Sequence, residues 1–329
     1  MSVLRILGRL LAMVAIITAS AASAEPLREI KFGISSSSLG PAGPRIAKEM
    51  GLFAKHGLDP AFVVLDSASA AVSGLISRSF EVSIAGPTEI VAAQARGQKV
   101  VAIAVSYAGF GPSLVLSKAV VDKLGVSPDS PIQDRLKALD GLLIGSPSAT
   151  SVATAAVKGS AVAYGANPRF TYMGQPTMVA ALESGAIQGY VASAPFWAFP
   201  IVKGTGVLWL SGPLNEFSRD VTPSITGQLA VLRAFAETNP AVIDSCVRAL
   251  ADFAKAIDER PADVKAAILK IFPDLDIKTL DLVFASESIA WKGKGMTAAD
   301  MAHEIAVVKS MGVQLPGIDK IDIGSMLFP

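Results

Sequence analysis

The stretch from Ile30 to Pro60 constrains the fold more than any other part of this sequence. It begins with a short apolar run, Ile30 to Ile34, and continues into four consecutive serines, 35–38. It ends in a segment whose apolar residues recur with helical spacing. This order indicates a buried strand, a hydroxyl-rich loop and an amphipathic helix. In an α/β sheet such a loop leaves the carboxyl end of its strand, where ligands bind and helix N–H groups point. We therefore expect this loop to hold a ligand.

The same alternation of short strands and helices continues along the chain. Further strands are expected at 61–65, 81–85, 100–105, 114–116, 142–144, 170–173, 187–192, 207–210 and 225–231, and the chain after Asn239 is expected to be helical. Alternating strands and helices form βαβ units, which build mostly parallel sheets with helices on both faces. The sequence therefore predicts an α/β fold. The segment 118–140 breaks the rhythm and is expected to be polar and irregular.

Two interruptions divide the pattern into two lobes. Tyr107 to Pro112 contains two glycines and a proline, which predicts a first crossing between lobes, and the polar loop before the strand at 225–231 predicts the return crossing. The expected domains are a signal peptide at 1–24, lobe I at 25–108 plus 222–329, and lobe II at 109–221.

The first 24 residues have the features of a cleaved secretory signal. Arg5 and Arg9 precede an apolar core at 10–19, and Ala22-Ser23-Ala24 forms a small-residue cleavage site. The core is too short to span a bilayer, which needs about 20 residues. The single cysteine, Cys246, is not at the cleavage site, which disfavours a lipoprotein, and its apolar neighbours suggest a small buried side chain. A free periplasmic protein is expected.

Charge and motifs exclude several functions. Without Arg5 and Arg9 the chain has 27 basic and 28 acidic residues, so it lacks the basic excess of a nucleic-acid-binding protein. The sequence has no paired-histidine, CxxC, calcium-loop, GxSxG or P-loop motif. His56 and His303 lie in charged helical surroundings that suggest surface roles. We expect no metal, no cofactor and no enzymatic activity.

Small polar loops precede several of the expected helices: Ser35–Ser38, Ser67–Ala70, Gly86–Thr88, Ser146–Ser151 and Gln175–Thr177. Converging helix N-termini and hydroxyl groups would bind an anion without a formal cation. The same serines would also serve as ordinary helix caps, so both interpretations stay open. Among the aromatic residues, Tyr107 and Trp197 are the best candidates for a wall of the ligand site, although core packing explains them equally well.

One segment, AKEMGLFAKHGLD at 47–59, closely resembles periplasmic substrate-binding proteins of the nitrate, sulfonate, taurine and thiamine-precursor ABC importers. The stretches 67–104 and LKALDGLLIGSPSATS at 136–151 are similar to later parts of the same family, so the resemblance covers essentially the whole mature chain. It implies a two-lobed Venus-flytrap fold with two crossing strands and a ligand clamped between the lobes.

The resemblance also implies ligand contacts. With Tyr107 added, the candidate ligand-binding residues are Ser36, Ser37, Ser69, Thr88, Tyr107, Ser148, Thr150, Pro195 and Trp197. Gln188 stands where many relatives carry an aspartate, and this departure disfavours a cationic or amine-bearing ligand such as taurine.

The sequence thus predicts a monomeric periplasmic solute-binding protein that captures a small organic anion, alkanesulfonate-like or carboxylate, and delivers it to an ABC permease. Two alternatives stay open: a neutral or aromatic ligand such as a pyrimidine, thiamine precursor or flavin, and a ligand-sensing module without transport. A third alternative is an enzyme like the eukaryotic pyrimidine synthases of this family, which consume a histidine and use pyridoxal phosphate. That would need a lysine and a histidine facing the cleft.

Overall fold

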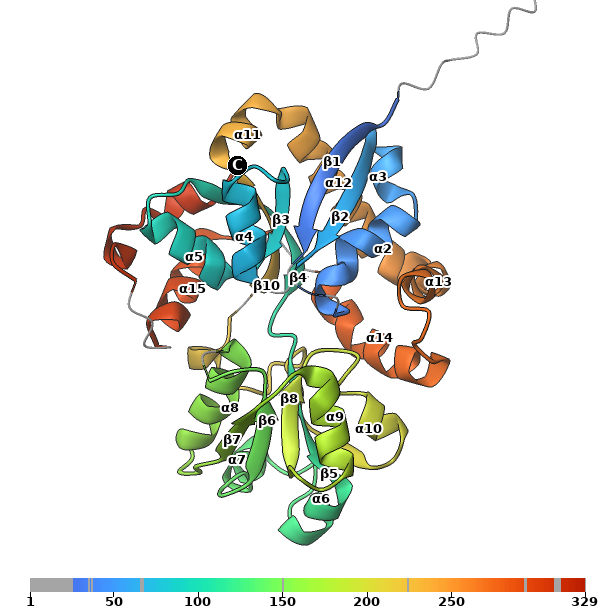
Figure 1. Ribbon diagram of the computed structural model, residues 1–329, viewed down its shortest axis with the longest axis vertical. Coiled ribbons are helices and arrows are strands. Elements are labelled where there is room, and N and C mark those ends of the chain that lie inside the picture. The colour runs from blue at the N-terminus through green and yellow to red at the C-terminus, as the bar shows by residue number, and fades with distance from the viewer. Residues whose placement is uncertain are drawn as a thin grey trace, which may run out of the picture.

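The computed structural model describes residues 26–328, apart from 35, 37, 66, 67, 150, 224, 293, 294 and 311–314. The predicted signal peptide lies outside the described residues. Two five-stranded sheets form two lobes that follow one another along the longest axis of the molecule (Figure 1). Within the described ranges, no helix combines the length and the apolar character needed to cross a membrane.

The sheet of lobe I has the strand order β2-β1-β3-β10-β4. Its strands are β1 (Arg28–Ile34), β2 (Leu58–Val64), β3 (Val82–Ala85), β4 (Val100–Ala108) and β10 (Ile225–Leu232). β1 runs parallel to β2 and β3, as the βαβ pattern predicts. β10 arrives from the other lobe and runs antiparallel to β3 and β4, so the sheet is mixed.

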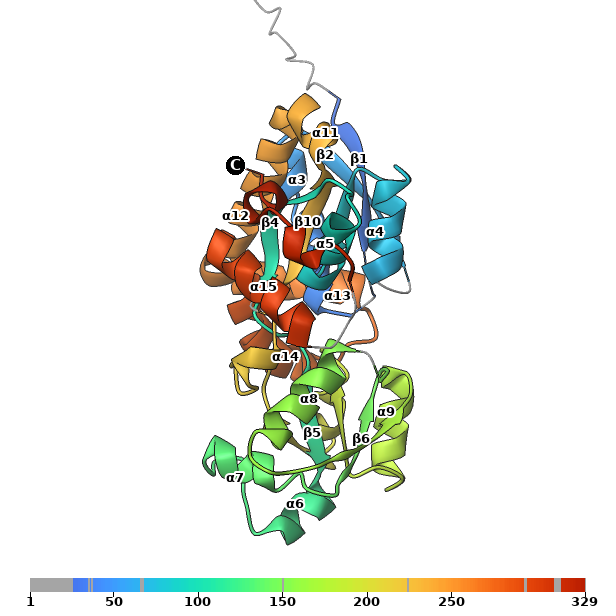
Figure 2. The same ribbon diagram turned by 90° about the vertical axis from the view of Figure 1, so that its left-hand side faces the viewer.

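Helices cover both faces of this sheet. One face carries α2 (Gly43–Glu49), α3 (Leu52–Lys55) and α12 (Pro240–Glu259), and the other carries α4 (Ala68–Ile76), α5 (Pro87–Ala95) and α15 (Ala298–Ser310) (Figures 1 and 2). The remaining elements of lobe I are η1 (Gly40–Ala42), α11 (Arg233–Thr238), α13 (Pro261–Ile271), α14 (Ile277–Trp291), η3 (Ile318–Lys320) and η4 (Ile323–Met326).

The long helix α12 shows how the sequence pattern produces packing. Its apolar stripe, predicted from residue spacing, is buried against α2 and α3. Cys246 lies in this stripe with no exposed surface, and burial raises the pKa of its thiol to about 12. A thiol in such a site stays protonated and behaves as a small apolar side chain.

Lobe II has the strand order β7-β6-β8-β5-β9. Its strands are β5 (Ser113–Ser117), β6 (Leu143–Ser146), β7 (Arg169–Tyr172), β8 (Gly189–Ala192) and β9 (Gly206–Leu210). β6 is parallel to β7 and β8, whereas β5 is antiparallel to β8 and β9. Its helices are α6 (Lys118–Leu124), α7 (Ile132–Lys137), α8 (Val152–Val162), α9 (Gln175–Glu183), α10 (Phe199–Val202) and η2 (Arg219–Val221).

The segment 118–140 is not irregular, contrary to the sequence-based expectation, because it contains α6 and α7. The N-terminus of α6 is capped by Ser117, whose Oγ accepts a hydrogen bond from the N–H of Val120 at 3.3 Å. None of the α6 residues is buried, so this helix has no apolar stripe from which it could be recognised.

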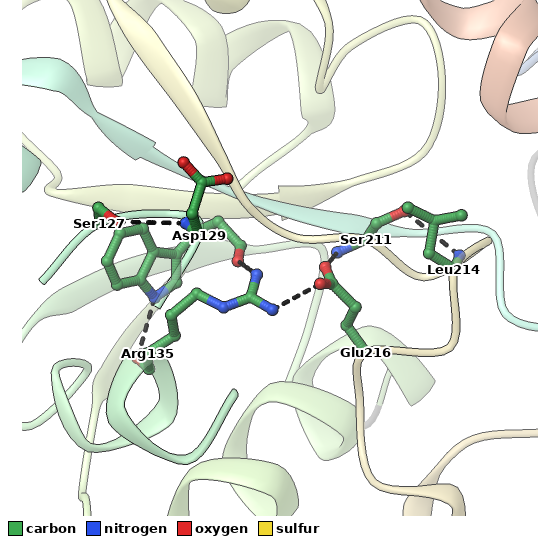
Figure 3. Close-up of polar contacts among 7 residues, drawn as sticks. Ser127, Asp129, Arg135, Ser211, Leu214 and Glu216 are labelled. Carbon is green, nitrogen blue, oxygen red and sulfur yellow. Dashed lines mark hydrogen bonds and ion pairs between the residues drawn. The ribbon is translucent and has the colours of Figure 1, made fainter. Parts of the chain in front are cut away.

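A buried arginine holds α7 against β9 and the following loop (Figure 3). The guanidinium of Arg135 donates to the carbonyl of Trp209 at 2.8 Å and forms a 2.5 Å ion pair with Glu216. The indole N–H of Trp209 donates back to the carbonyl of Arg135 at 2.9 Å. The second carboxylate oxygen of Glu216 accepts the N–H of Ser211 at 2.7 Å. This network fixes the loop that begins the return crossing.

The two segments that join the lobes lie against each other. Thr226 Oγ1, on the return segment, donates to the carbonyl of Gly109, on the first segment, at 2.9 Å. Gly212 approaches the first segment so closely that a Cβ there would lie 2.2 Å from the Pro112 carbonyl oxygen and 2.3 Å from that of Phe110. Only glycine fits between two backbone carbonyls at this distance.

Replacing Gly212 with alanine is therefore expected to destabilise the protein by about 1–3 kcal/mol, since the backbone of one segment must move. Urea unfolding would measure the loss, and small-angle scattering would detect an altered arrangement of the lobes. Gly295→Ala is the matched control, because a Cβ at Gly295 would meet no atom within 4 Å. Equal stability of the two variants would show that the close approach carries no constraint.

Candidate functional site: a cavity between the lobes

A cavity of about 240 Å³ lies between the two sheets, and both lobes line it. Lobe I contributes the loop after β1, the N-terminus of α5, the end of β4 and one side chain of α14, while lobe II contributes α8 and the loop after β8. The described lining residues that carry polar side chains are Ser36, Ser38, Thr88, Glu89, Tyr107, Ser193, Thr226 and Glu287. This volume is slightly below the usual range for small-molecule sites, so the cavity suits a small solute.

The serine loop after β1 forms one wall and contacts the opposite lobe directly. Ser36 Oγ and Ser38 Oγ share a 2.7 Å hydrogen bond. The next residue, Leu39, donates its N–H to the carbonyl of Ala194 in lobe II at 3.0 Å. Ala194 also lines the cavity, so this backbone hydrogen bond joins the lobes at the wall of the cavity.

The N-terminus of α5 forms a second wall. Pro87 occupies the first turn, where its missing N–H costs nothing, and Thr88 faces the cavity. The carboxylate of Glu89 interacts with the backbone N–H groups of Gly86 and of Glu89 itself. Burial raises the pKa of Glu89 more than these hydrogen bonds lower it. The free donors of this helix end are thus partly used by an acidic side chain of the same helix.

A buried tyrosine and a buried glutamate meet in the floor of the cavity. Tyr107 is 2% exposed and Glu287 is 1% exposed, and a Cβ at Gly40 would contact both the Tyr107 ring and Glu287 Oε2 within 4 Å. Burial raises the pKa of Glu287 to about 8, and the Tyr107 phenol lowers it slightly. Burial and the nearby carboxylate together raise the pKa of Tyr107. Neither Tyr107 Oη nor Glu287 Oε1 has a hydrogen-bond partner.

The position of Glu287 is fixed by the packing of α14. Trp291, one turn further along the same face, is 3% exposed and donates its indole N–H to the carbonyl of Gly40 at 3.0 Å. Gly40 belongs to the 3-10 turn after the serine loop. The C-terminal part of the chain is thereby attached to the first ligand loop, and this attachment brings Glu287 to the cavity.

The lobe II wall begins at the N-terminus of α8. Val152 and Ala153 line the cavity there. Ser151 caps the helix, since its Oγ accepts the N–H of Thr154 at 3.2 Å. On the other side, the N–H of Ser193 donates to the Gln175 side chain at 2.8 Å. These polar groups are satisfied within lobe II and hold the wall in place.

The structure brings three of the sequence-predicted site residues together: Ser36, Thr88 and Tyr107 all line the cavity. Four others do not belong to its lining: Ser69, Ser148, Pro195 and Trp197. Ser37 and Thr150 lie outside the described residues. Ser69 and Ser148 are exposed, and the carbonyl of Ser148 accepts from Thr154 Oγ1 at 2.6 Å, a capping arrangement.

Trp197 is 1% exposed and packs in the apolar core that joins the two lobes. Gln188, the departure from the family pattern, is also away from the cavity. Its side-chain oxygen accepts the N–H of Leu143 at 2.6 Å. Its effect is thus structural, and the argument it gave against a cationic ligand does not apply at this cavity.

Two functional candidates, Glu89 and Glu287, were missed by sequence reasoning. A signal for Glu287 exists: it interrupts an apolar stripe of α14 that includes Leu280, Val283 and Trp291, all buried. A glutamate in such a stripe is rare unless it is paired or functional. Nothing in the sequence indicates that this stripe meets a ligand loop more than 240 residues earlier.

The enzyme alternative requires a lysine and a histidine at the cleft. Neither residue type occurs among the described residues that line the cavity. His56 pairs with Asp252 at 2.9 Å, and His303 interacts with the carbonyl of Thr222 at 3.0 Å. In the part of the chain that the structure describes, no three His, Cys, Asp or Glu residues form a group that would hold a metal ion.

Solved structures with the same architecture cover almost the whole chain. The periplasmic aliphatic sulphonate binding protein of Escherichia coli matches with a TM-score of 0.69 and 16% identity, over 91% of this chain and 98% of that protein. The alkanesulfonate-binding protein of Xanthomonas axonopodis pv. citri matches with 0.65 and 14%, over 92% and 99%. The periplasmic nitrate-binding protein of Synechocystis matches with 0.57 and 13%, over 86% and 80%.

The fold is therefore that of the two-lobed periplasmic binding proteins, as the sequence predicted. A search of curated protein sequences finds no significant match. The chain belongs to the NMT1-like family, whose model matches residues 23–272.

Proposed function

We propose that this protein is the periplasmic solute-binding component of an ABC importer, that it works as a monomer, and that it delivers a small solute to a membrane permease. The observation that carries the proposal is the cavity whose lining comes from both lobes. A solute in such a cavity contacts both lobes, so its binding energy favours the closed arrangement. The family and the three binding proteins of the same fold support this function.

The proposal includes the domain boundaries and part of the site. Lobe I comprises 25–108 plus 222–329, and lobe II comprises 109–221, following a signal peptide at 1–24. The membership of the strands in the two sheets supports these limits. Ser36, Thr88 and Tyr107 contact the solute, and their positions in the cavity lining support that role.

The first candidate ligand is the small organic anion expected from the sequence, such as an alkanesulfonate or a carboxylate. Two features favour it. The three similar binding proteins bind sulfonates or nitrate, and the helices α5 and α8 both begin at the cavity. Helix N-termini stabilise negative charge.

The lining favours the second candidate, a ligand that donates hydrogen bonds. The described lining residues include the carboxyl groups of Glu89 and Glu287 but no Lys, Arg or His. The N-terminal donors of α5 and α8 are partly occupied by Glu89 and Ser151. An anion in this cavity would meet two carboxyl groups without a compensating cation. A neutral or aromatic solute with N–H groups fits these surroundings better.

Filling the cavity tests the function without knowing the solute. Val152→Phe is expected to weaken binding of every solute at least tenfold, because the larger side chain occupies the space beside the N-terminus of α8. The measurement is a thermal-shift screen of mature protein refolded to remove bound solute, followed by titration calorimetry of each hit. A solute at a hundredfold over its dissociation constant stabilises by about 2.7 kcal/mol.

Val162→Phe is the matched control, since Val162 lies on the same helix and is 53% exposed. The control should bind like the parent protein. Equal binding by both variants would place the solute outside this cavity, and a screen without any hit among anions, amines, amides and ring compounds would contradict the solute-binding role.

Import and sensing differ in the event that binding triggers. Transport predicts that cells lacking the gene lose uptake of the radiolabelled hit and regain it with the parent protein but not with Val152→Phe. Normal uptake in the deletion strain, with an altered transcriptional response to the solute, would favour the sensing alternative.

A further inference from the structure

We infer that the solute is a small organic cation with N–H groups, a protonated amine or an amidinium, and that Glu287 on α14 is the residue that selects it. This inference rests on the proposed function and names the ligand class of the same cavity. Its basis is the placement of two carboxyl groups and a phenol around one small enclosed space.

The first support is the chemistry of the lining. Glu287 approaches from α14 and Glu89 from α5, while the remaining polar side chains among the described lining residues are hydroxyl groups. Hydroxyl groups donate and accept equally well, so they do not discriminate between ligand charges. The two carboxyl groups do discriminate, because an ionised carboxylate only accepts hydrogen bonds.

The second support is the unsatisfied state of the buried groups. Glu287 Oε1 and Tyr107 Oη have no hydrogen-bond partner although both side chains are almost fully buried. Buried polar groups without partners are costly and uncommon in folded proteins. Both side chains belong to the cavity lining, where a ligand N–H group would supply the missing donor to Glu287.

The charged groups around Glu287 are few. Among the described lining residues, the titratable ones are Glu287, Tyr107 and Glu89. On α14 itself, Lys278, Asp281 and Lys292 are exposed or paired elsewhere: Asp281 with Lys265, and Lys292 with Asp258. Arg45, on the neighbouring helix α2, stacks over the ring of Phe272. Besides burial, only the Tyr107 phenol affects the pKa of Glu287, so a cation for this carboxylate must come from the solute.

A cationic solute would bind the ionised carboxylate, which burial disfavours in the empty protein. Affinity for a cation should therefore rise with pH, about tenfold between pH 6 and pH 7, and level off above pH 8. An anionic solute would show the reverse dependence, since it requires the neutral carboxyl group. A neutral amide would show a weaker dependence than an amine with the same skeleton.

The test uses two matched probe sets, built on propyl and benzyl skeletons, each with an amine, an amidine, an amide, a carboxylate and a sulfonate. Alkylamines stay protonated up to about pH 10. Binding of each probe to the refolded mature protein is measured by titration calorimetry at pH 6, 7 and 8. We expect the amines or amidines to bind, with affinity increasing with pH, and Glu287→Gln to weaken their binding at least tenfold at pH 8.

Asp281→Asn is the control, because it removes the same charge from an exposed position of the same helix. It should bind like the parent protein and keep the pH dependence. The pH series on the unmodified protein keeps the test decisive if Glu287→Gln folds poorly. Binding of carboxylates or sulfonates in place of the cations, or amine binding that Glu287→Gln leaves unchanged, would overturn the inference while leaving the solute-binding role intact. Absence of binding by every probe and every compound of the wider screen would overturn both.

Discussion

Replacing Arg135 with methionine is expected to lower the free energy of unfolding by about 3–5 kcal/mol, the range for breaking one side of a buried ion pair. Arg135 is 8% exposed, and its removal leaves the Glu216 carboxylate and the Trp209 carbonyl without their donor. Glu216 would keep only the N–H of Ser211. Urea denaturation followed by circular dichroism would measure the loss.

Arg248→Met serves as the control for this prediction. Arg248 pairs with Asp244 one turn away on α12, and both side chains are more than half exposed. Exposed pairs of this kind contribute less than about 1 kcal/mol. If the two variants were equally stable, the Arg135 network would be no more important than a surface contact.

The ligand-free protein is expected to lose stability as pH rises from about 5 to 8. Burial raises the pKa of Glu287 to about 8 from the ordinary value of 4.5, so the folded state holds a proton that the unfolded chain releases above pH 4.5. The stability associated with this proton is fully present below pH 4.5 and is lost as pH rises through 8. The slope reaches about 1.4 kcal/mol per pH unit.

Glu287→Gln should flatten this dependence, because an amide does not titrate. Glu89, whose pKa is also raised by burial, gives a remaining slope of the same sign. Urea unfolding at pH 5, 6.5 and 8 would compare the parent protein, Glu287→Gln and the control Asp281→Asn. Parallel pH profiles for all three proteins would show that Glu287 is not buried in the way that the structure describes.

The architecture was predictable because each short apolar run is followed by a turn and a helical pattern. The run at Ile30–Ile34 and the polar loop after it are the strand β1 and the first wall of the cavity. Strand direction was less predictable. β10 belongs to the first sheet only because the chain returns from lobe II, and its antiparallel pairing with β4 depends on that return.

The site was predictable only where it lies on loops next to strands. Ser36, Thr88 and Tyr107 follow or end strands of one sheet, so the parallel pattern brings them to one edge. Glu287 reaches the cavity through contacts between α14 and the turn at Gly40, which no local pattern encodes. Ser148 has the expected residue type and spacing, but hydrogen bonds at the start of α8 involve its carbonyl instead of exposing its hydroxyl to the cavity.

The buried thiol of Cys246 makes this chain convenient for optical reporting. It is the only cysteine of the sequence, and with a pKa of about 12 and no exposed surface it does not react with maleimide dyes in the folded state. Two cysteines introduced at exposed positions of different lobes, such as Ser69 and Ser148, would therefore accept a donor and an acceptor dye without removal of the native one. Energy transfer between the dyes would then follow the movement of the lobes, one molecule at a time, for each solute in turn.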